Sequence, residues 1–137
     1  MTSSPPDYET WAEFRYQIRR FLRTAEANAR EIGLAPQQHQ LLLAVRGFPG
    51  GKTPTIGDLA ERLQLRHHST VELVDRMEEG GLVLRRPTMS GREVAVLLTP
   101  RGRQLLAAVT RRMRPELDEA GSRLIAALSR LVRTPPP

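Results

Sequence analysis

The sequence contains no cysteine among its 137 residues. Disulfides, thiolate metal sites and a thiol-based redox switch are therefore excluded. Apolar runs of membrane-spanning length are also missing, and residues 1–8 lack the basic and apolar regions of a secretory signal. These absences predict a soluble, cytoplasmic protein with no membrane segment. A chain of this length is expected to fold as one domain around one core.

Lysine is almost absent, since Lys52 stands alone beside twenty arginines. The formal net charge is +6, and its distribution is uneven: residues 83–114 carry +7, whereas residues 65–82 carry −2. Guanidinium groups pair bidentately with phosphate, so this excess suits a phosphate-rich partner. A genome that favours arginine codons explains the Arg-to-Lys ratio equally well.

The first half of the chain shows a helical pattern with clear end signals. Apolar residues spaced by three and four from Trp11 onward predict one long amphipathic helix that ends near Gly33. Pro36 then opens a second helix, 37–46. After a glycine- and proline-rich loop, 47–54, the capping box of Thr55 and Asp58 predicts a short helix over 56–63.

The second half adds a hairpin between helices. A helix is predicted over 67–79, stopped by two glycines, followed by strands at 82–86 and 92–98 around the turn 87–91. Thr99 and Pro100 open the next helix. Pro115 is expected to break or kink it, so that a separate amphipathic helix ends the chain.

Two short helices joined by a tight turn and followed by a hairpin form the layout of a winged helix-turn-helix. The predicted fold is therefore mainly α with a small β-hairpin wing. In the helix 67–79, which would read the DNA, Val71, Val74 and Met77 are assigned to the core, so the polar residues face outward. An isolated polar helix face is usually only solvated, but the arginines around the hairpin turn favour contact with DNA. The candidate DNA-binding residues are Arg66, His67, His68, Ser69, Glu72, Arg76, Arg85, Arg86, Ser90 and Arg92.

The acidic residues of the predicted reader helix need an explanation beside a DNA surface. Glu72 could accept a hydrogen bond from a cytosine amino group, and Asp75 could pair with an arginine of the wing. Most of the affinity would then come from arginines on phosphates: Arg85, Arg86, Arg92, Arg101 and Arg103.

Residues 34–102 resemble the MarR family of multiple antibiotic resistance regulators. The resemblance is carried by Pro54-Thr-Ile-Gly-Asp-Leu-Ala-Glu-Arg-Leu63, Ser69-Thr-Val-Glu-Leu-Val-Asp-Arg-Met77, Gly81-Leu-Val83 and Leu98-Thr-Pro-Arg-Gly102. It implies a homodimer that binds a palindromic operator in double-stranded DNA, usually as a repressor released by a small-molecule effector. The family wing typically carries Asp-x-Arg; here Ser90 replaces the acidic residue and Arg92 is retained. The resemblance implies that Arg92 enters the minor groove.

The same resemblance divides the chain into three parts. Residues 7–33 form an N-terminal dimerisation helix, 34–99 the winged DNA-binding lobe, and 100–133 the C-terminal dimerisation helices. Effectors of the family bind between the dimer helices and the lobe, so Trp11, Arg15 and His39 are candidates for a ligand pocket.

Other functions have weaker support. The loop Gly47-Phe-Pro-Gly-Gly-Lys-Thr53 resembles a phosphate-binding loop, but the required first glycine is Arg46 and a helix precedes it. Adjacent His67 and His68 point about 100° apart on a helix and do not readily share a metal ion. We therefore expect no cofactor, no metal and no enzymatic activity. The alternative is a winged-helix interaction module whose arginines grip an acidic protein.

Overall fold

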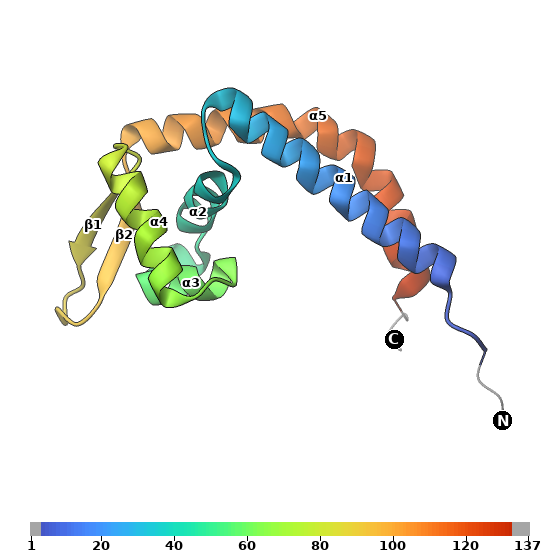
Figure 1. The fold of residues 1–137 in the computed structure, drawn as a ribbon, viewed down its shortest axis with the longest axis horizontal. Helices are drawn as coiled ribbons and strands as arrows, with labels where there is room; N and C mark the ends of the chain where they lie inside the picture. The colour runs from blue at the N-terminus through green and yellow to red at the C-terminus, as the bar shows by residue number, and fades with distance from the viewer. Residues whose placement is uncertain (1–3, 133–137) are drawn as a thin grey trace.

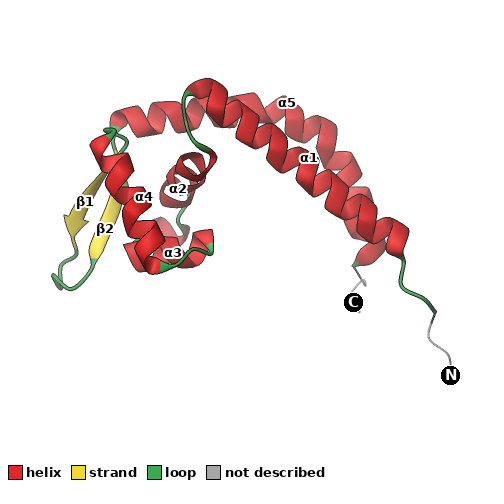
Figure 2. Cartoon of the chain, in the orientation of Figure 1, coloured by secondary structure: helices red, strands yellow, loops and turns green. Residues whose placement is uncertain are grey.

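The computed structural model describes residues 4–132 and contains five helices, one hairpin and one short 3-10 turn in that range. The order is α1 (Tyr8–Ile32), α2 (Pro36–Arg46), the turn Pro49–Gly51, α3 (Ile56–Leu63), α4 (His67–Glu79), β1 (Val83–Pro87), β2 (Val94–Leu98) and α5 (Pro100–Leu131). Figures 1 and 2 show α2, α3, α4 and the hairpin gathered at one end of the molecule, with α1 and α5 extending away from them. The predicted mainly α fold with a β-hairpin wing is confirmed.

The helix starts follow the capping signals in the sequence. The Thr55 hydroxyl accepts from the Asp58 backbone N–H at 3.1 Å, and the Asp58 carboxylate accepts from the Thr55 N–H at 2.9 Å. The Thr99 hydroxyl accepts from the Gly102 N–H at 3.1 Å. These three hydrogen bonds satisfy backbone donors that have no partner within the helix.

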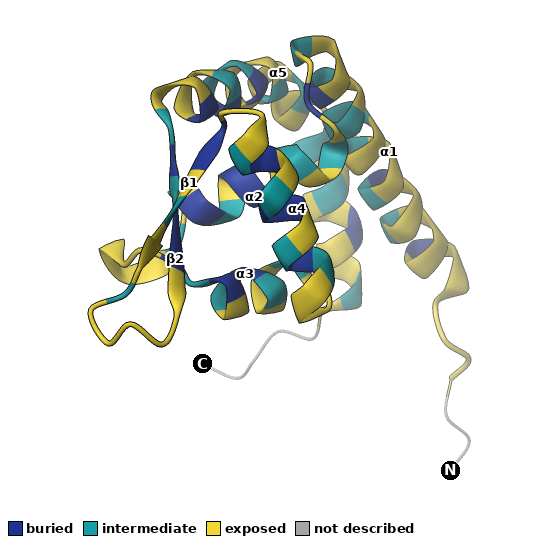
Figure 3. Ribbon diagram, turned by 60° about the vertical axis from the view of Figure 1, so that its left-hand side comes forward, coloured by how far each residue is buried: buried dark blue, intermediate teal, exposed yellow. Residues whose placement is uncertain are grey.

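The core of the lobe lies between the short helices and the hairpin. Figure 3 shows the buried residues on the inward sides of α2, α3, α4 and β2. The hairpin is antiparallel, and Arg85 lies opposite Val96 in its register. An isolated bridge from Thr55 to Ala95 attaches the start of α3 to β2. The largest side chains that are fully buried are Leu41, Leu42, Leu59, Leu73, Met77, Val74, Val83, Val96 and Val109.

Helices α1 and α5 lie side by side and antiparallel (Figure 1). An ion pair between Glu31 and Arg112 joins them near the lobe, and Arg130 lies 4.0 Å from Asp7 at the far end. Their shared interface leaves many large apolar side chains exposed, including Trp11 at 53%. This half of the molecule is therefore much less closed than the lobe.

Helix α5 joins the lobe at Gly102, which packs against the backbone of Leu82. A Cβ placed on Gly102 would lie 2.2 Å from the Leu82 carbonyl oxygen. The Leu82 carbonyl also accepts from the Thr99 N–H at 3.0 Å. Glycine thus permits the close approach that positions α5 on the lobe.

The predicted break of the helix at Pro115 is wrong, because α5 continues through it as one helix; the alternative of a kink at Pro115 stays a prediction. Proline removes one backbone N–H, whose acceptor in a regular helix is the carbonyl of Arg111. Both residues are exposed, so water can bind that carbonyl. Packing of α5 on α1 before and after the proline holds the helix together. The C-terminal part is therefore one helix, not two.

Within residues 4–132, no helix is both long and apolar enough to cross a bilayer.

Candidate nucleic-acid interface

Helix α4 has one buried and one exposed face. Thr70, Leu73, Val74 and Met77 are buried, whereas Val71 is only half-buried, so the predicted core face missed Thr70 and Leu73. Ser69 is half-buried as well. The exposed face presents four of the predicted reader side chains: His67, His68, Glu72 and Arg76.

The start of α4 is held by backbone contacts and leaves Arg66 exposed. Arg66 is the N-cap residue but supplies no side-chain cap. Its carbonyl accepts from the Thr70 N–H at 3.1 Å and from the Thr70 hydroxyl at 3.0 Å. The helix therefore begins at His67 as predicted, and the Arg66 side chain is not needed to hold its end.

The tip of the wing is ordered by hydrogen bonds of Ser90. Its hydroxyl lies 3.1 Å from the Thr88 hydroxyl and accepts from the Arg92 N–H at 3.3 Å. Gly91, at φ +72°, closes the turn, and its N–H donates to the Thr88 carbonyl at 2.9 Å. Ser90 thus holds the backbone of the turn that carries Arg92. Arg86 and Arg92 are both exposed.

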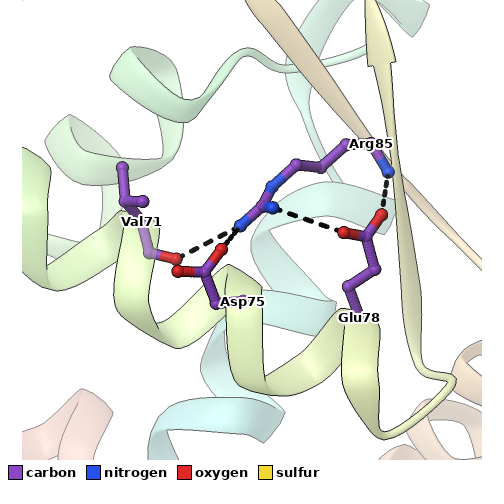
Figure 4. Close-up of polar contacts among 4 residues, drawn as sticks. All are labelled: Val71, Asp75, Glu78 and Arg85. Carbon is purple, nitrogen blue, oxygen red and sulfur yellow. Dashed lines mark hydrogen bonds and ion pairs between the residues drawn. The ribbon is translucent and has the colours of Figure 1, made fainter.

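Arg85 differs from the other wing arginines, because it points back to α4 (Figure 4). Its guanidinium pairs with Asp75, lies 3.3 Å from Glu78 and donates to the Val71 carbonyl at 3.4 Å. The Glu78 carboxylate also accepts from the Arg85 backbone N–H at 3.0 Å. The arginines around the hairpin turn were predicted to contact DNA, and in the structure the guanidinium of Arg85 is paired with two carboxylates of α4. Its side chain fastens β1 to α4.

The contacts of Arg85 with Asp75 and Glu78 account for part of the negative charge of residues 65–82. Asp75 pairs with a wing arginine, as expected, and Glu78 shares the same partner. Two of the four carboxylates of α4 are therefore compensated inside the protein. Glu72 is left on the exposed reader face, and Glu79 lies at the exposed C-terminal end.

His67 and Arg92, which come from different elements, line one open groove of about 490 Å³. The N-terminus of α3 completes its wall with Thr55, Gly57 and Asp58. The sequence analysis assigned Thr55 and Asp58 only to a capping box. The β-bridge between Thr55 and Ala95 brings the N-terminus of α3 against the wing. The sequence pattern did not predict this bridge.

The expected ligand pocket of Trp11, Arg15 and His39 does not form within one chain. Trp11 and Arg15 lie in the first turns of α1, whereas α2, which carries His39, lies beside the other end of that helix (Figure 1). A helix of 25 residues spans about 37 Å. His39 is half-buried, and burial lowers the pKa of its imidazole below the usual value. A role of His39 in a ligand pocket stays a prediction.

Metal chemistry finds no support in the part of the chain that is described, 4–132. No group of three or more His, Cys, Asp or Glu side chains there could hold a metal ion. The loop after α2 is an irregular turn that follows a helix, which differs from the strand-to-helix loop of nucleotide-binding proteins.

Comparison with known proteins finds a family model that matches part of the chain and several solved structures with a similar fold. Residues 32–93 match the model of the MarR family. RV1404 from Mycobacterium tuberculosis is similar in structure, with 21% identity, a TM-score of 0.74 and coverage of 96% of this chain and 95% of that one. A mutant of MarR from E. coli in complex with operator DNA has 20% identity and a TM-score of 0.70, covering 85% and 86%. No curated protein matches the sequence.

A mutant of MepR from S. aureus bound to an oligodeoxyribonucleotide is also similar. Its identity is 19% and its TM-score 0.65, and the match covers 93% of this chain and all of that one (100%). These similarities extend over nearly the whole chain, so the fold shared with these proteins includes α1 and α5 as well as the lobe.

Proposed function

We propose that this chain, whose residues 32–93 match the model of the MarR family, is a winged-helix transcription regulator that acts as a dimer and binds a specific operator in double-stranded DNA. The observation that carries this proposal is the shared groove of His67 and Arg92. It joins the start of the reader helix to the wing on one exposed side. A winged helix-turn-helix places those two elements in adjacent grooves of a duplex.

In this proposal α4 enters the major groove with its N-terminal end leading. The exposed side chains of His67, His68 and Arg76 contact base edges, and Glu72 accepts from a cytosine amino group. Arg92 enters the minor groove, where a narrow width concentrates negative potential. The remaining contacts, from Arg66, Ser69, Arg86 and Ser90, fix the register on the phosphates.

The similar structures support this reading. The E. coli protein is held in complex with operator DNA, and the S. aureus protein is bound to an oligodeoxyribonucleotide. Both share the arrangement of reader helix and wing with this chain.

Dimerisation is proposed from the open face of α1 and α5. Tyr8, Trp11, Tyr16, Ile125 and other large apolar side chains of these two helices are exposed, and a partner that covers such side chains removes them from water. A two-fold partner would cover it and present two reader helices to two half-sites about one helical turn apart. Residues 7–33 and 100–133 form the dimerisation region and 34–99 the DNA-binding lobe; residue 133 lies outside the described part. The exposed side chains are Tyr8, Trp11, Tyr16, Leu22, Leu117, Ile125 and Leu128.

The role that fits such a regulator is repression in the cytoplasm, with release by a small-molecule effector. Selection of bound sequences from a random duplex pool tests the DNA half of this proposal. We expect an inverted repeat, bound more tightly than random DNA at every salt concentration tested. Equal affinity for selected and random duplexes across a salt titration would contradict sequence-specific binding.

Arg92→Ala, compared with Arg30→Ala, tests the wing contact. Both changes remove one exposed guanidinium, but only the first lies in the proposed interface. We expect Arg92→Ala to lower operator affinity by about tenfold or more, and Arg30→Ala to leave it within about twofold. Equal losses would mean that only net charge matters. Unchanged DNA binding together with capture of an acidic protein would favour the interaction-module alternative.

Ile125→Glu tests the dimer. Ile125 is 66% exposed on α5, so a carboxylate there leaves the chain foldable but cannot be covered by an apolar partner. Sedimentation at micromolar concentration should show a dimer for the native chain and a monomer for the variant. Met89→Glu, at a fully exposed position between the two strands of the wing, is the control and should stay dimeric. A native monomer would overturn this part of the proposal.

A further inference from the structure

The turn of the wing carries a methionine that is fully exposed. The relative exposure of Met89 is 107%, so its side chain is as accessible as in an extended peptide, and residues 4–132 do not cover it. The other two methionines that the structure describes have partners in the protein. Met77 is completely buried, and the half-buried Met113 sulfur accepts from the Asn28 amide at 3.1 Å. Packing within the chain therefore accounts for Met77 and Met113 but not for Met89.

The turn holds Met89 at a fixed place on the backbone. Met89 and Ser90 are the central residues of the turn 88–91, which the Gly91 N–H closes by donating to the Thr88 carbonyl at 2.9 Å. The Thr88 N–H donates to the Glu93 carbonyl at 3.0 Å, one step further into the hairpin. The centre of a turn favours glycine, proline, asparagine, aspartate and serine. The turn itself therefore does not require a methionine at this position.

Met89 belongs to a small apolar surface, the apolar tip, which consists of Pro87, Met89 and Val94. Pro87 and Val94 lie opposite each other in the register of the hairpin, and both are exposed. Single exposed apolar residues are common on proteins, but these three share the end of one projecting hairpin. Figure 1 shows this end on the side of the lobe away from the chain termini. A partner that covers α1 and α5 would therefore leave the apolar tip open.

Cations flank the apolar tip in the sequence. Arg86 and Arg92 are exposed, and within residues 4–132 neither has a carboxylate at ion-pair distance. Glu93 is the single acidic residue of 86–94, so this segment keeps a net positive charge. An apolar surface with guanidinium groups beside it fits a partner that combines a flat apolar face with negative charge. A step between two base pairs, with a phosphate backbone on either side, is such a partner.

From this arrangement we infer that Met89 is an apolar wedge, which enters the minor groove beside Arg92 and inserts between two base pairs. This inference rests on the proposed function, which puts the wing in the minor groove. Methionine has an unbranched and polarisable side chain that adapts well to an aromatic surface. Insertion unstacks the step and bends the duplex toward its major groove. Because the proposed function puts α4 in that groove, the bend turns the duplex around the lobe.

A wedge adds selectivity at a step whose base edges it does not read. Pyrimidine–purine steps such as TA and CA unstack and kink more easily than other steps. The energy needed to open the step therefore depends on its sequence. We expect a pyrimidine–purine step in each half-site of the selected operator, at the position where Met89 inserts.

Fluorescence of 2-aminopurine, placed in turn at each step of the selected operator, tests the insertion, because stacking quenches this base analogue. Binding of the native chain should raise the fluorescence at one step in each half-site. Met89→Leu keeps the apolar body and should do the same. Met89→Ala, which is too short, and Met89→Gln, which ends in a polar amide, should not. All three variants change a fully exposed side chain, so their thermal unfolding should match that of the native chain.

Operator affinity measures what the wedge contributes to binding. Met89→Ala should bind the operator about fivefold more weakly or worse, because it loses the apolar area that insertion buries. Met89→Leu should stay within about twofold. The control Leu43→Ala shortens another exposed apolar side chain, on α2, and should also stay within about twofold.

Hydrogen peroxide provides a probe that needs no substitution. The Met89 sulfur takes up one oxygen atom and is oxidised to the polar sulfoxide, while the peroxide is reduced to water. Oxidation of the native chain, verified at Met89 by mass spectrometry, should weaken operator binding and abolish the rise in fluorescence. Met89→Leu treated in the same way should keep both.

Several results would overturn the wedge alone. They are equal operator affinity of the native chain and Met89→Ala, no rise in fluorescence at any step, and full operator affinity of the chain oxidised at Met89. A changed sedimentation of Met89→Ala, with operator binding intact, would make the apolar tip a protein contact instead. A native chain that binds no duplex at all would overturn the proposed function and the wedge together.

Discussion

The lobe and the pair of long helices, α1 and α5, differ in how completely they bury their large apolar side chains. In the lobe, Leu42, Leu59 and Val74 are completely removed from water by residues of the same chain, and Leu106 and Val109 of α5 belong to the same core. The pair α1 and α5 leaves Trp11 and Ile125 more than half exposed. Burial of large apolar side chains within one chain stabilises the lobe, whereas the exposed apolar side chains of the helix pair contribute no such stabilisation in the single chain. The contrast lies between a packed core and a helix pair with exposed apolar side chains.

The largest expected effect comes from the closed core. Leu42 and Leu43 are neighbours on α2, but Leu42 is 0% exposed and Leu43 is 52% exposed. Leu42→Ala should lower the free energy of unfolding by about 2–5 kcal/mol, because it removes buried methyl groups and leaves a cavity. Leu43→Ala should cost less than about 1 kcal/mol. Urea denaturation measures both, and equal losses would mean that the lobe is not packed as described.

Two glycines of α5 sharpen the comparison, since one lies at the lobe and one in the open helix pair. A Cβ on Gly102 would meet the Leu82 carbonyl, whereas none of the heavy atoms around Gly121 comes within 4 Å of such a Cβ. Gly102→Ala should destabilise by about 1–3 kcal/mol through forced displacement. Gly121→Ala should stabilise by about 0.5–1 kcal/mol through helix propensity. Thermal unfolding should shift in opposite directions for the two variants, and a shared sign would contradict the close approach at Gly102.

Ion pairs in the lobe and in the helix pair should also differ in coupling energy. Arg85 and Glu78 lie within the lobe, with side chains 27% and 36% exposed, whereas Arg112 and Glu31 join the long helices at 45% and 63%. A double-mutant cycle on Arg85→Gln and Glu78→Gln should give a coupling of about 1 kcal/mol. The cycle on Arg112→Gln and Glu31→Gln should give about 0–0.5 kcal/mol. A stronger coupling between Arg112 and Glu31 than between Arg85 and Glu78 would contradict the view that the lobe holds its ion pairs more tightly.

The Arg85 pair has a functional readout besides stability. Because Arg85 fastens β1 to α4 and does not lie at the wing tip, Arg85→Gln should reduce operator affinity less than Arg92→Ala. Fluorescence anisotropy with a labelled operator measures both. An equal or larger loss of operator affinity for Arg85→Gln would indicate that Arg85 contacts the DNA directly.

The smallest expected effect is a pH dependence from the lobe. Burial lowers the pKa of His39 in the folded chain, so the unfolded chain binds more protons near and below the usual pKa of about 6.5. Stability should therefore be full above that pH and fall as the pH decreases through it. His39→Gln should flatten the stability profile between about pH 5 and 7. A profile that keeps its slope in the variant would assign the dependence to other groups.

Much of this architecture follows from local chemistry. The capping residues Thr55 and Thr99 satisfy free backbone donors wherever they occur before a helix, so their positions predicted the starts of α3 and α5. The hairpin was equally local, because turn residues separated two apolar runs. The exposed reader residues His68, Glu72 and Arg76 followed from helical periodicity alone.

Other features depended on contacts between distant residues. Pro115 carries a strong local signal against a helix, but packing on α1 outweighed it. Arg85 and Arg92 both flank the hairpin turn in the sequence. Only the structure shows that Arg85 pairs with Asp75 and Glu78 and so holds β1 against α4. The separation of Trp11 from His39 likewise depends on the direction in which α1 leaves the lobe.

The sequence by itself determined the order of the elements, the polar face of α4 and the excess of arginine, because each depends on residues a few positions apart. Tertiary structure alone decided which wing arginines are paired within the protein and which stay exposed. Asp75 and Glu78 meet Arg85 only because β1 packs against α4. The winged fold could therefore be predicted from the sequence, whereas the pairing of Arg85 could not.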